Sequence, residues 1–424
     1  MSGVHQNLYI EWRGDTCRIR WWSGEYYADG RKRYESRGGF TDEDEALAYG
    51  QDQLYEIRHG LHVSNRAGAI LMTDWLDEWL AALDHAHLTE KTYRSRIEAH
   101  IRPYFAQKTV AEIDVLAYRS FAKHVRGSVS KGTAQNVIMV LRMVLDDAVP
   151  RLLKVSPAER KQRRGRYAPK RRERKADMRE EDVEQLARNA EVLLGFPGYV
   201  FIWTMAMTGM RPAELYGLTR EYCYPNWPAC DPRADPDEED RYTEDMERYG
   251  KGEDLMPAIR VERQVQYKDS TLQFFAPKYG SFRPLVIPPF LADLLEKLLA
   301  SHDSAWVFPG LKGNSLGSAA FDTYYWRPIA DGAPERKDRW ARRPRPAIRA
   351  VARYKGKRLY LVRHGHKQWL DEDGHPRVAV EARMGHWLPG MDGVYGSVTV
   401  AMERAIMAAL QGRWERLRRT QRMV

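Results

Sequence analysis

Hydrophobic and polar residues alternate along the first part of the chain. The runs LYIEW, CRIRWW and RYESRGGF have the two-residue period of β-strands, and the turn signals RGD and ADG separate them. A stretch with helical spacing follows between Thr41 and Gly60. The pattern predicts a small three-stranded sheet with one helix, which we assign to a first domain of residues 1–68.

From about residue 70 the apolar positions follow a helical period instead. They recur at Trp75, Leu76, Trp79, Leu80 and Leu83, then at Tyr93, Ile97 and Ile101, and then at Val137, Ile138, Leu141, Val144 and Leu145. Such stripes are typical of amphipathic helices that pack on a common core. We therefore expect an all-helical second domain over residues 69–153.

The remainder of the chain mixes helical and strand patterns. The run GYVFIWTMAMTGMRPAELYGL predicts a buried helix that breaks at Thr208-Gly209 and restarts at Pro212. Downstream, IRVERQVQYK and LQFFAPKYGSFRPLVIP have the composition of strands, with Lys278 in the turn of a hairpin. We expect a mixed, mainly helical α+β domain over residues 177–424, so the predicted fold class is multidomain.

Charge points to a polyanionic partner. The 424 residues include 68 Lys and Arg against 58 Asp and Glu, a net charge of +10, which favours nucleic acid or an acidic membrane surface. Residues 154–176 hold eleven basic residues and two acidic ones, and this composition predicts an exposed interdomain linker that can clamp nucleic acid. Residues 231–254 hold eleven acidic and four basic residues and read as a disordered or loosely helical surface insertion.

Other classes of protein fit less well. No apolar run approaches the length of a membrane-spanning helix, and the N-terminus lacks the apolar core of a signal peptide. We therefore expect a cytoplasmic protein that does not associate with a membrane. Neither the cysteines nor the clustered histidines have the spacing of a disulfide framework or a zinc site; they are Cys17, Cys223, Cys230, His364, His366 and His375.

Two stretches of the first 153 residues could contact nucleic acid. Arginines and lysines alternate with tryptophans and tyrosines in the predicted sheet, which suits phosphate contact by a sheet laid into a groove. A basic sheet that contacts another protein remains open. The helical domain carries short hydroxyl, amide and basic side chains near its helix N-termini, where either phosphate binding or simple capping explains them.

Polar residues at three positions of the last domain are candidates for chemistry. Arg211 stands just before a helix N-terminus, where a buried guanidinium needs an anion; a surface ion pair with Glu214 is the alternative. Arg363 stands at the opening of another predicted helix. In the segment MGHWLPGMDGVYG, His386 and Tyr395 lie nine residues apart among helix-breaking residues.

The order and spacing of these residues resemble the catalytic signature of the tyrosine recombinase, or phage integrase, family. The pieces are TGMRPAEL with Arg211, Lys278 in a β-turn, Arg363 in VRHGHKQWL, His386 in MGH, and Tyr395. Each piece alone is weak, but five in order over about 185 residues are specific. The sheet domain is similar to an arm-type DNA-binding domain of this family, and the helical domain to its core-binding domain.

The resemblance implies a site-specific recombinase that integrates or excises a mobile element or phage genome. Tyr395 is implied as the nucleophile that forms a 3′-phosphotyrosyl link, and His386 as a hydrogen-bond or proton-transfer partner of the phosphate. Arg211 and Arg363 would clamp non-bridging phosphate oxygens, and Lys278 would protonate the leaving 5′ oxygen. Because the covalent link stores the phosphodiester energy, neither a cofactor nor a metal ion is needed.

One position departs from the family pattern. Members usually carry histidine three residues before the second arginine, and this chain has Tyr360 there. A phenol can donate a hydrogen bond to phosphate but cannot act as a base at neutral pH, so any proton-accepting role at Tyr360 is in doubt. Residues 222–257 and 329–358 exceed a minimal catalytic domain, and the second, very basic stretch is expected to add DNA contacts.

The implied partners are double-stranded attachment-site DNA and a homotetramer assembled on it, with a DNA-bending host factor and an excision factor as further candidates, in the cytoplasm of a bacterium or phage-infected host. The amphipathic stretch after Tyr395 either packs on a neighbouring subunit or on its own domain. A type IB topoisomerase-like enzyme and a non-catalytic DNA-binding regulator are the rival functions.

Overall fold

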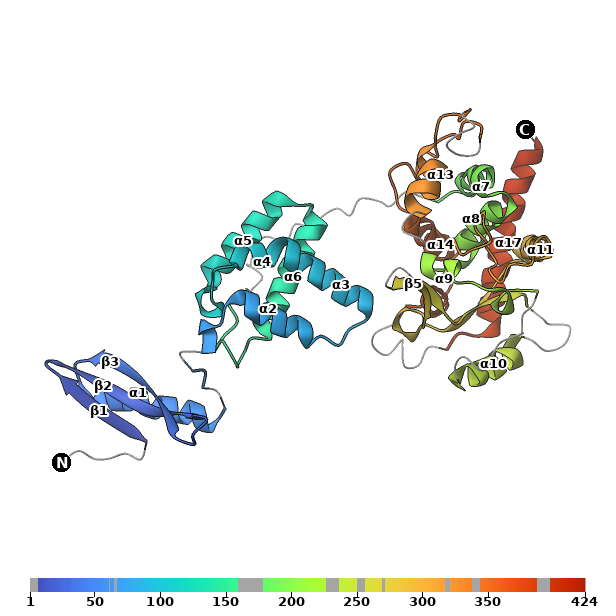
Figure 1. The fold of residues 1–424 in the computed structure, drawn as a ribbon. Coiled ribbons are helices and arrows are strands. Elements are labelled where there is room, and N and C mark those ends of the chain that lie inside the picture. Colours follow the sequence, from blue (N-terminus) through green and yellow to red (C-terminus); the bar gives the residue numbers. More distant parts are fainter. Residues whose placement is uncertain are drawn as a thin grey trace. The chain divides into compact units, whose positions relative to one another are not determined.

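The computed structural model describes the chain in two compact units, residues Met1–Pro169 and Lys170–Val424 (Figure 1). The described residues are 7–60, 62–64, 67–158, 178–225, 236–249, 256–268, 271–316, 321–337, 344–386 and 397–423. No helix within these ranges is long and apolar enough to cross a membrane.

The first unit begins with the predicted sheet. Strands β1 (Leu8–Arg13), β2 (Thr16–Tyr26) and β3 (Lys32–Phe40) pair antiparallel in that order, and α1 (Glu43–Arg58) packs on one face. Cys17, Ile19 and Trp21 alternate along β2 and are buried towards α1, because every second side chain of a strand faces the same side. Gly50 lets the helix approach closely, since a Cβ there would lie 2.8 Å from Leu8 Cδ2.

A second, separate core in this unit is helical. Its elements are α2 (Met72–Ala81), α3 (His87–Arg96), the π-helix η2 (Ile97–Ile101), α4 (Arg102–Phe105), η3 (Val110–Glu112), α5 (Val115–Ser128) and α6 (Lys131–Asp146), with η1 (Ala67–Ala69) before them. The apolar stripes predicted from the sequence meet in one cluster that shares no residue with the core of the sheet. The predicted sheet with its helix and the predicted all-helical part are therefore confirmed. The boundaries 1–68, 69–153 and 154–176 stay predictions.

The second unit surrounds helix α8 (Phe196–Thr208), which is buried from Gly198 to its end and is mainly apolar on every side, as expected of a central helix. Its other helices are α7 (Glu180–Leu194), α9 (Pro212–Tyr216), α10 (Pro236–Tyr249), α11 (Pro289–Ala300), α13 (Arg327–Asp331), α14 (Tyr360–Glu372), α15 (Arg377–Met384) and α17 (Val400–Met423), with short turns η4 (Arg220–Tyr222), η7 (Lys278–Gly280) and η8 (Asp322–Trp326). This mainly helical α+β unit confirms the predicted fold class.

The strands of the second unit pair differently from the prediction. β4 (Ala258–Val261) pairs with β7 (Arg283–Val286), whereas β5 (Gln264–Lys268) and β6 (Thr271–Phe275) form a hairpin of their own. Lys278 therefore lies in the turn η7 that connects two small sheets, and the prediction of a hairpin turn at this residue was wrong. The reason is that β6 folds back on β5 before the chain returns to β4, which local sequence patterns do not reveal.

Part of the acidic insertion is folded. Helix α10 places Glu238 and Asp245 within 3.4 Å of the guanidinium of Arg260, whose side chain is completely buried. Glu262 lies 3.3 Å from the same group. A buried cation is costly without anions, so these acidic side chains compensate the charge of Arg260. The acidic composition therefore has a structural use that we did not predict.

The C-terminal helix α17 packs on its own unit. Ile406, Leu410 and Leu417 enter the core around α8, and the indole of Trp414 stacks on Phe290 with ring centroids 4.3 Å apart. Arg413 is buried and forms ion pairs with Glu180, Glu372 and Asp373. Of the two arrangements that the sequence left open, these contacts correspond to packing on its own domain.

Truncating the core side chain of Leu410 should therefore destabilise the chain. Leu410→Ala removes a fully buried side chain, and the expected loss in the free energy of unfolding of the second unit is about 2–5 kcal/mol. Arg419→Ala, on the exposed face of the same helix, is the control and should change it by less than about 0.5 kcal/mol. Equal unfolding transitions for both variants in urea would contradict the packing of α17 described here.

Candidate active site

The site begins where α8 ends. Gly209 adopts a left-handed conformation with φ +63°, and a Cβ at this position would lie 2.5 Å from His366 Cδ2. Only glycine fits such a close approach in this conformation. The chain turns there, and Arg211 becomes the residue before α9, with Pro212 in the first turn. The break and restart predicted from the sequence are confirmed.

Arg211 and Glu214 form a buried pair. Arg211 Nη1 donates to Glu214 Oε1 at 2.8 Å, and the backbone N–H of Arg211 donates to Oε2 at 2.8 Å. Only 8% of Arg211 and 1% of Glu214 are exposed, so the alternative of a surface pair is wrong. Arg211 also donates from Nη1 to Ser281 Oγ at 3.0 Å and from Nη2 to the carbonyl oxygen of Gly385 at 2.8 Å.

A second arginine shares the same carboxylate. Arg283 Nη2 donates to Glu214 Oε2 at 2.8 Å, and its Nε donates to the carbonyl oxygen of Arg383 at 2.9 Å. Burial would raise the pKa of Glu214, but the guanidinium of Arg283, with the contacts of Arg211, outweighs burial and holds that pKa below its usual range. Glu214 is therefore an anion that fixes two cations at once.

Arg363 enters the same cluster from the first turn of α14. It is 1% exposed and donates from Nη1 to the carbonyl oxygen of Gly209 and from Nη2 to that of Met384. Nη2 also lies 3.2 Å from His386 Nε2. Burial lowers the pKa of Arg363, and the charge of Arg211 lowers it further, to about 10. Burial and the charge of Arg211 both disfavour the Arg363 cation. An anion bound next to the two arginines would stabilise it.

His386 follows the left-handed Gly385 that ends α15. Its Nδ1 lies 2.7 Å from Glu381 Oε2, and the other oxygen of this carboxylate accepts from Lys367 Nζ. The pKa of His386 is lowered, first by burial and then by the charge of Arg363, against the opposing effect of Glu381. The imidazole therefore lies between the cation of Arg363 and the anion of Glu381, and burial disfavours its protonated form.

The other predicted site residues that the structure describes, Tyr360 and Lys278, form no hydrogen bond to the arginine cluster. Tyr360 begins α14 one turn before Arg363, whose guanidinium lies 5.8 Å from the Tyr360 ring centroid. Lys278 is exposed in η7, three residues before the Ser281 that contacts Arg211. Tyr395 lies outside the described residues. The structure thus brings Arg211, Arg363 and His386 together, with Tyr360 beside them.

Both arginines keep donors in reserve. A guanidinium has five N–H bonds. The contacts above use three of them on Arg211 and three on Arg363, and within the described ranges no residue accepts from Nε of either one. Arg283, in contrast, donates from all three of its nitrogens, to Glu214 and to the carbonyl oxygens of Ser281 and Arg383. Arg211 and Arg363 therefore each keep N–H donors that can bind oxygens of an added anion.

Four residues of the cluster were missed by sequence reasoning. Ser281 and Arg283 follow Lys278 within the motif region, and their nearness to it was the available signal. Glu381 lies five residues before His386, and Lys367 lies one turn after Arg363 on α14. Spacing along α14 could have suggested Lys367, but the meeting of α14 and α15 that joins it to Glu381 is a tertiary contact.

The histidines considered for metal binding do not gather with other ligands. His366 is fully buried, with Nδ1 2.8 Å from the carbonyl oxygen of Ala206 and Nε2 accepting from Arg383 Nε at 3.1 Å. Both ring nitrogens are therefore committed to the protein. Among the described residues, no group of three or more His, Cys, Asp or Glu side chains is arranged to hold a metal ion.

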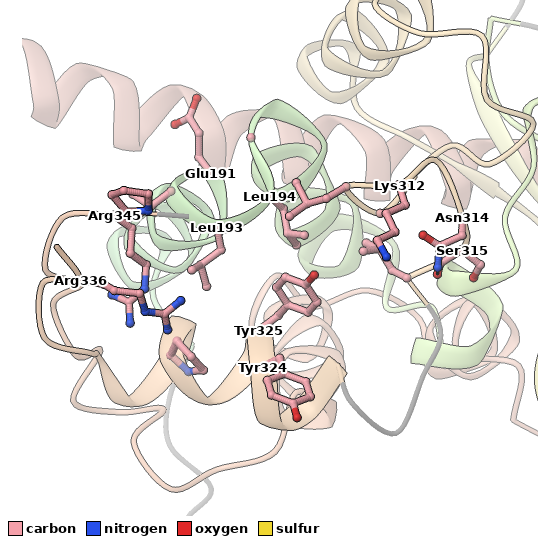
Figure 2. A pocket seen from close by; sticks show the side chains of 17 residues that line it. Glu191, Leu193, Leu194, Lys312, Asn314, Ser315, Tyr324, Tyr325, Arg336 and Arg345 are labelled. Atoms are coloured by element: carbon pink, nitrogen blue, oxygen red, sulfur yellow. Dashed lines mark hydrogen bonds between the residues drawn. The ribbon is translucent and has the colours of Figure 1, made fainter. Parts of the chain in front are cut away.

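A cavity of about 930 Å³ lies elsewhere in the second unit (Figure 2). Figure 2 shows Leu193 and Leu194 at the end of α7 facing Tyr325 of η8, with Arg336 and Arg345 at another side. None of the predicted site residues lines it. Large pockets often mark ligand sites, but the candidate catalytic residues lie in the arginine cluster, outside this cavity.

The stability lost when the shared anion is removed should depend on pH. The folded-state pKa of Glu214 is depressed, so its stabilising effect is complete above the usual glutamate pKa of 4.5 and is lost as the pH falls through the lower folded value. Glu214→Gln should lower the free energy of unfolding at neutral pH by about 3–5 kcal/mol, because two buried cations lose their partner. The difference from wild type should shrink below pH 4.5 in denaturant titrations. A difference that is constant with pH would show that Glu214 is not the ionised partner.

Comparison with known proteins supports the fold. No family model and no curated protein sequence matches the chain. Two structures of a Tn1549 transposon integrase variant in complex with circular intermediate DNA are similar, with TM-scores of 0.53 and 0.52 and 14% identity, covering 79% and 80% of this chain and 98% and 99% of the other. A complex of this integrase with transposon right end DNA has a TM-score of 0.50 at 15% identity and covers 79% and 97%. The chain therefore has the fold of this integrase, as the resemblance to tyrosine recombinases implied.

Proposed function

We propose that this protein is a site-specific DNA recombinase that cuts and rejoins DNA through a 3′-phosphotyrosine intermediate. The observation that carries the proposal is the convergence of Arg211, Arg363 and His386 from three separate segments on one cluster, in which both guanidiniums are buried and keep unused donors. The fold shared with an integrase whose structures contain DNA agrees with it. Planar guanidiniums bind phosphate oxygens well, so two of them in one cluster suit a phosphodiester.

The nucleophile in this proposal is Tyr395. A tyrosine phenol ordinarily has a pKa near 10 and attacks poorly at neutral pH, so neighbouring cations and a proton acceptor must assist it. Arg211 and Arg363 bind the two non-bridging oxygens, whose charge grows in the transition state. Because their guanidiniums are already fixed by Glu214 and by backbone carbonyl groups, little reorganisation accompanies the reaction.

Proton delivery to the leaving group is assigned to Lys278. The tyrosine oxygen forms a bond to phosphorus as the bond to the 5′ oxygen breaks, and the ammonium group of Lys278 gives its proton to that oxygen. The exposed turn η7 leaves this side chain able to reach a bound strand. Tyr360 is assigned a hydrogen bond to a phosphate oxygen, and the covalent link conserves the phosphodiester energy for rejoining.

The partners follow from this chemistry. Strand exchange between two DNA sites needs two pairs of nucleophiles, so we assign a homotetramer on double-stranded attachment-site DNA, with a DNA-bending host factor and an excision factor as accessories, in the cytoplasm. The sheet of the first unit is assigned to arm-type DNA. On its outer side the guanidinium of Arg20 lies 5.6 Å from the Tyr34 ring centroid, and Lys32 Nζ lies 5.2 Å from that of Trp22. Such cation–aromatic pairs suit phosphate contact.

A nicked suicide substrate tests the proposal. Because the nick lets the cleaved strand diffuse away, wild-type protein should accumulate a covalent protein–DNA adduct on DNA from an integration junction of the element. Peptide mapping should place the DNA on Tyr395, and Tyr395→Phe should bind the DNA without forming an adduct. An adduct on another tyrosine, such as the highly exposed Tyr279, would show that the nucleophile is assigned wrongly. Relaxation of supercoiled DNA by the protein alone would favour the topoisomerase alternative.

The two arginines should matter for rate more than for affinity. Arg211→Ala and Arg363→Ala each remove a preorganised donor, so the single-turnover cleavage rate should fall about 10² to 10³-fold while the dissociation constant for the site changes little. Arg188→Ala, an exposed residue of α7 paired with Glu184 and Glu191, is the matched control and should leave the rate near wild type. If binding and cleavage fall equally, the arginines anchor DNA and do not stabilise the transition state.

A further inference from the structure

The cluster lacks a proton acceptor at the place where the family has one. Tyr360 occupies the position of the usual histidine, and a neutral phenol does not accept a proton at neutral pH. His366 has both ring nitrogens committed, and burial lowers its pKa well below the usual range. His364 packs edge-on against the ring of Tyr360. Of these imidazoles, His386 is the one in contact with Arg363.

The contacts of His386 define its protonation. A carboxylate only accepts hydrogen bonds, so the 2.7 Å contact with Glu381 Oε2 assigns the ring proton to Nδ1. Nε2 then carries the lone pair and accepts from Arg363 Nη2 at 3.2 Å. Glu381 is itself fixed, since it is buried on α15 and its other oxygen binds Lys367. The imidazole is therefore held with its basic nitrogen turned towards the arginine cluster.

We infer that Glu381, clamped by Lys367, is a positioning residue that makes His386 the proton acceptor for the nucleophile, replacing the function that Tyr360 cannot supply. This inference rests on the proposed recombinase function. When phosphate binds, its oxygens attract the Arg363 guanidinium and release Nε2. The phenolic proton of Tyr395 moves to Nε2 as the tyrosine oxygen bonds to phosphorus, the phosphorus–5′-oxygen bond breaks, and Lys278 protonates the 5′ oxygen. Glu381 stabilises the imidazolium that forms, as the carboxylate of a carboxylate–imidazole pair does.

The charges around His386 act in opposite directions. On α14, Arg363 and Lys367 disfavour the imidazolium, and on α15 the carboxylate of Glu381 favours it; burial, the largest influence, also lowers the His386 pKa. Two further cations are close, since Arg211 binds the carbonyl oxygen of Gly385 and a Cβ on Gly385 would lie 2.9 Å from Arg283 Nη1. Glu214 compensates Arg211 and Arg283, whereas Glu381 is the carboxylate in contact with His386, so removal of Glu381 should change the pH dependence of the reaction.

The pH profile of single-turnover cleavage on the suicide substrate tests the inference. A proton acceptor must be deprotonated, so the wild-type rate should rise with pH through the His386 pKa and then level off. Glu381→Gln removes the stabilising charge, and it should move this acidic limb to lower pH and reduce the plateau by about 10² to 10⁴-fold without weakening DNA binding. Lys367→Met removes a cation and should move the limb to higher pH. Glu296→Gln, an exposed residue of α11, is the matched control and should leave the profile unchanged.

The outcomes separate this inference from the proposed function. Opposite shifts of the limb in Glu381→Gln and Lys367→Met support the positioning role. A Glu381→Gln variant with a reduced plateau and an unmoved limb would reveal a structural role only, and one with a wild-type profile would remove Glu381 from the mechanism; either result overturns the inference while the adduct on Tyr395 still stands. If wild-type protein formed no adduct on any cleaved DNA, the proposed function itself would fail.

Discussion

The buried carboxylate of Glu214 is the interaction on which the arginine cluster depends. It joins the guanidiniums of Arg211 and Arg283 and also accepts the backbone N–H of Arg211. Without an anion, two guanidinium cations would lie almost fully buried with their charges uncompensated, and each would lower the stability of the fold by several kcal/mol. With it, the plane of Arg211 is fixed by the folded chain alone. The geometry of the proposed phosphate clamp is therefore a property of the folded chain.

Backbone carbonyl groups complete the clamp. The carbonyls of Gly209 and Met384 accept from Arg363, and that of Gly385 accepts from Arg211. These carbonyls belong to the ends of α8 and α15, where helices leave carbonyl groups without internal partners. The two left-handed glycines that end the helices thus have a second role, because the arginines tie both helix ends together. Preorganised donors of this kind are the usual source of electrostatic stabilisation in a transition state.

Local patterns predicted the elements but not their contacts. The strands of the first sheet, the break after α8 and the helix that carries Arg363 follow from hydrophobic period, glycine and proline, which act over a few residues. The pairing of β5 with β6, the burial of the Arg211–Glu214 pair and the Glu381–His386 contact depend on how distant elements meet, which no short spacing encodes. The motif order named Arg211, Arg363 and His386, which the structure brings together; their catalytic roles and the position of Tyr395 stay predictions.

The central claim is that Arg211 and Arg363 act as a single clamp on one phosphate. A double-mutant cycle on the single-turnover cleavage rate measures this most directly, with Arg211→Ala, Arg363→Ala and the double variant on the same substrate. Residues that act as a unit are strongly non-additive, so the double variant should be little slower than either single variant. If the two rate losses instead multiply, so that the coupling energy is below about 0.5 kcal/mol, the arginines act independently and the clamp described here is contradicted.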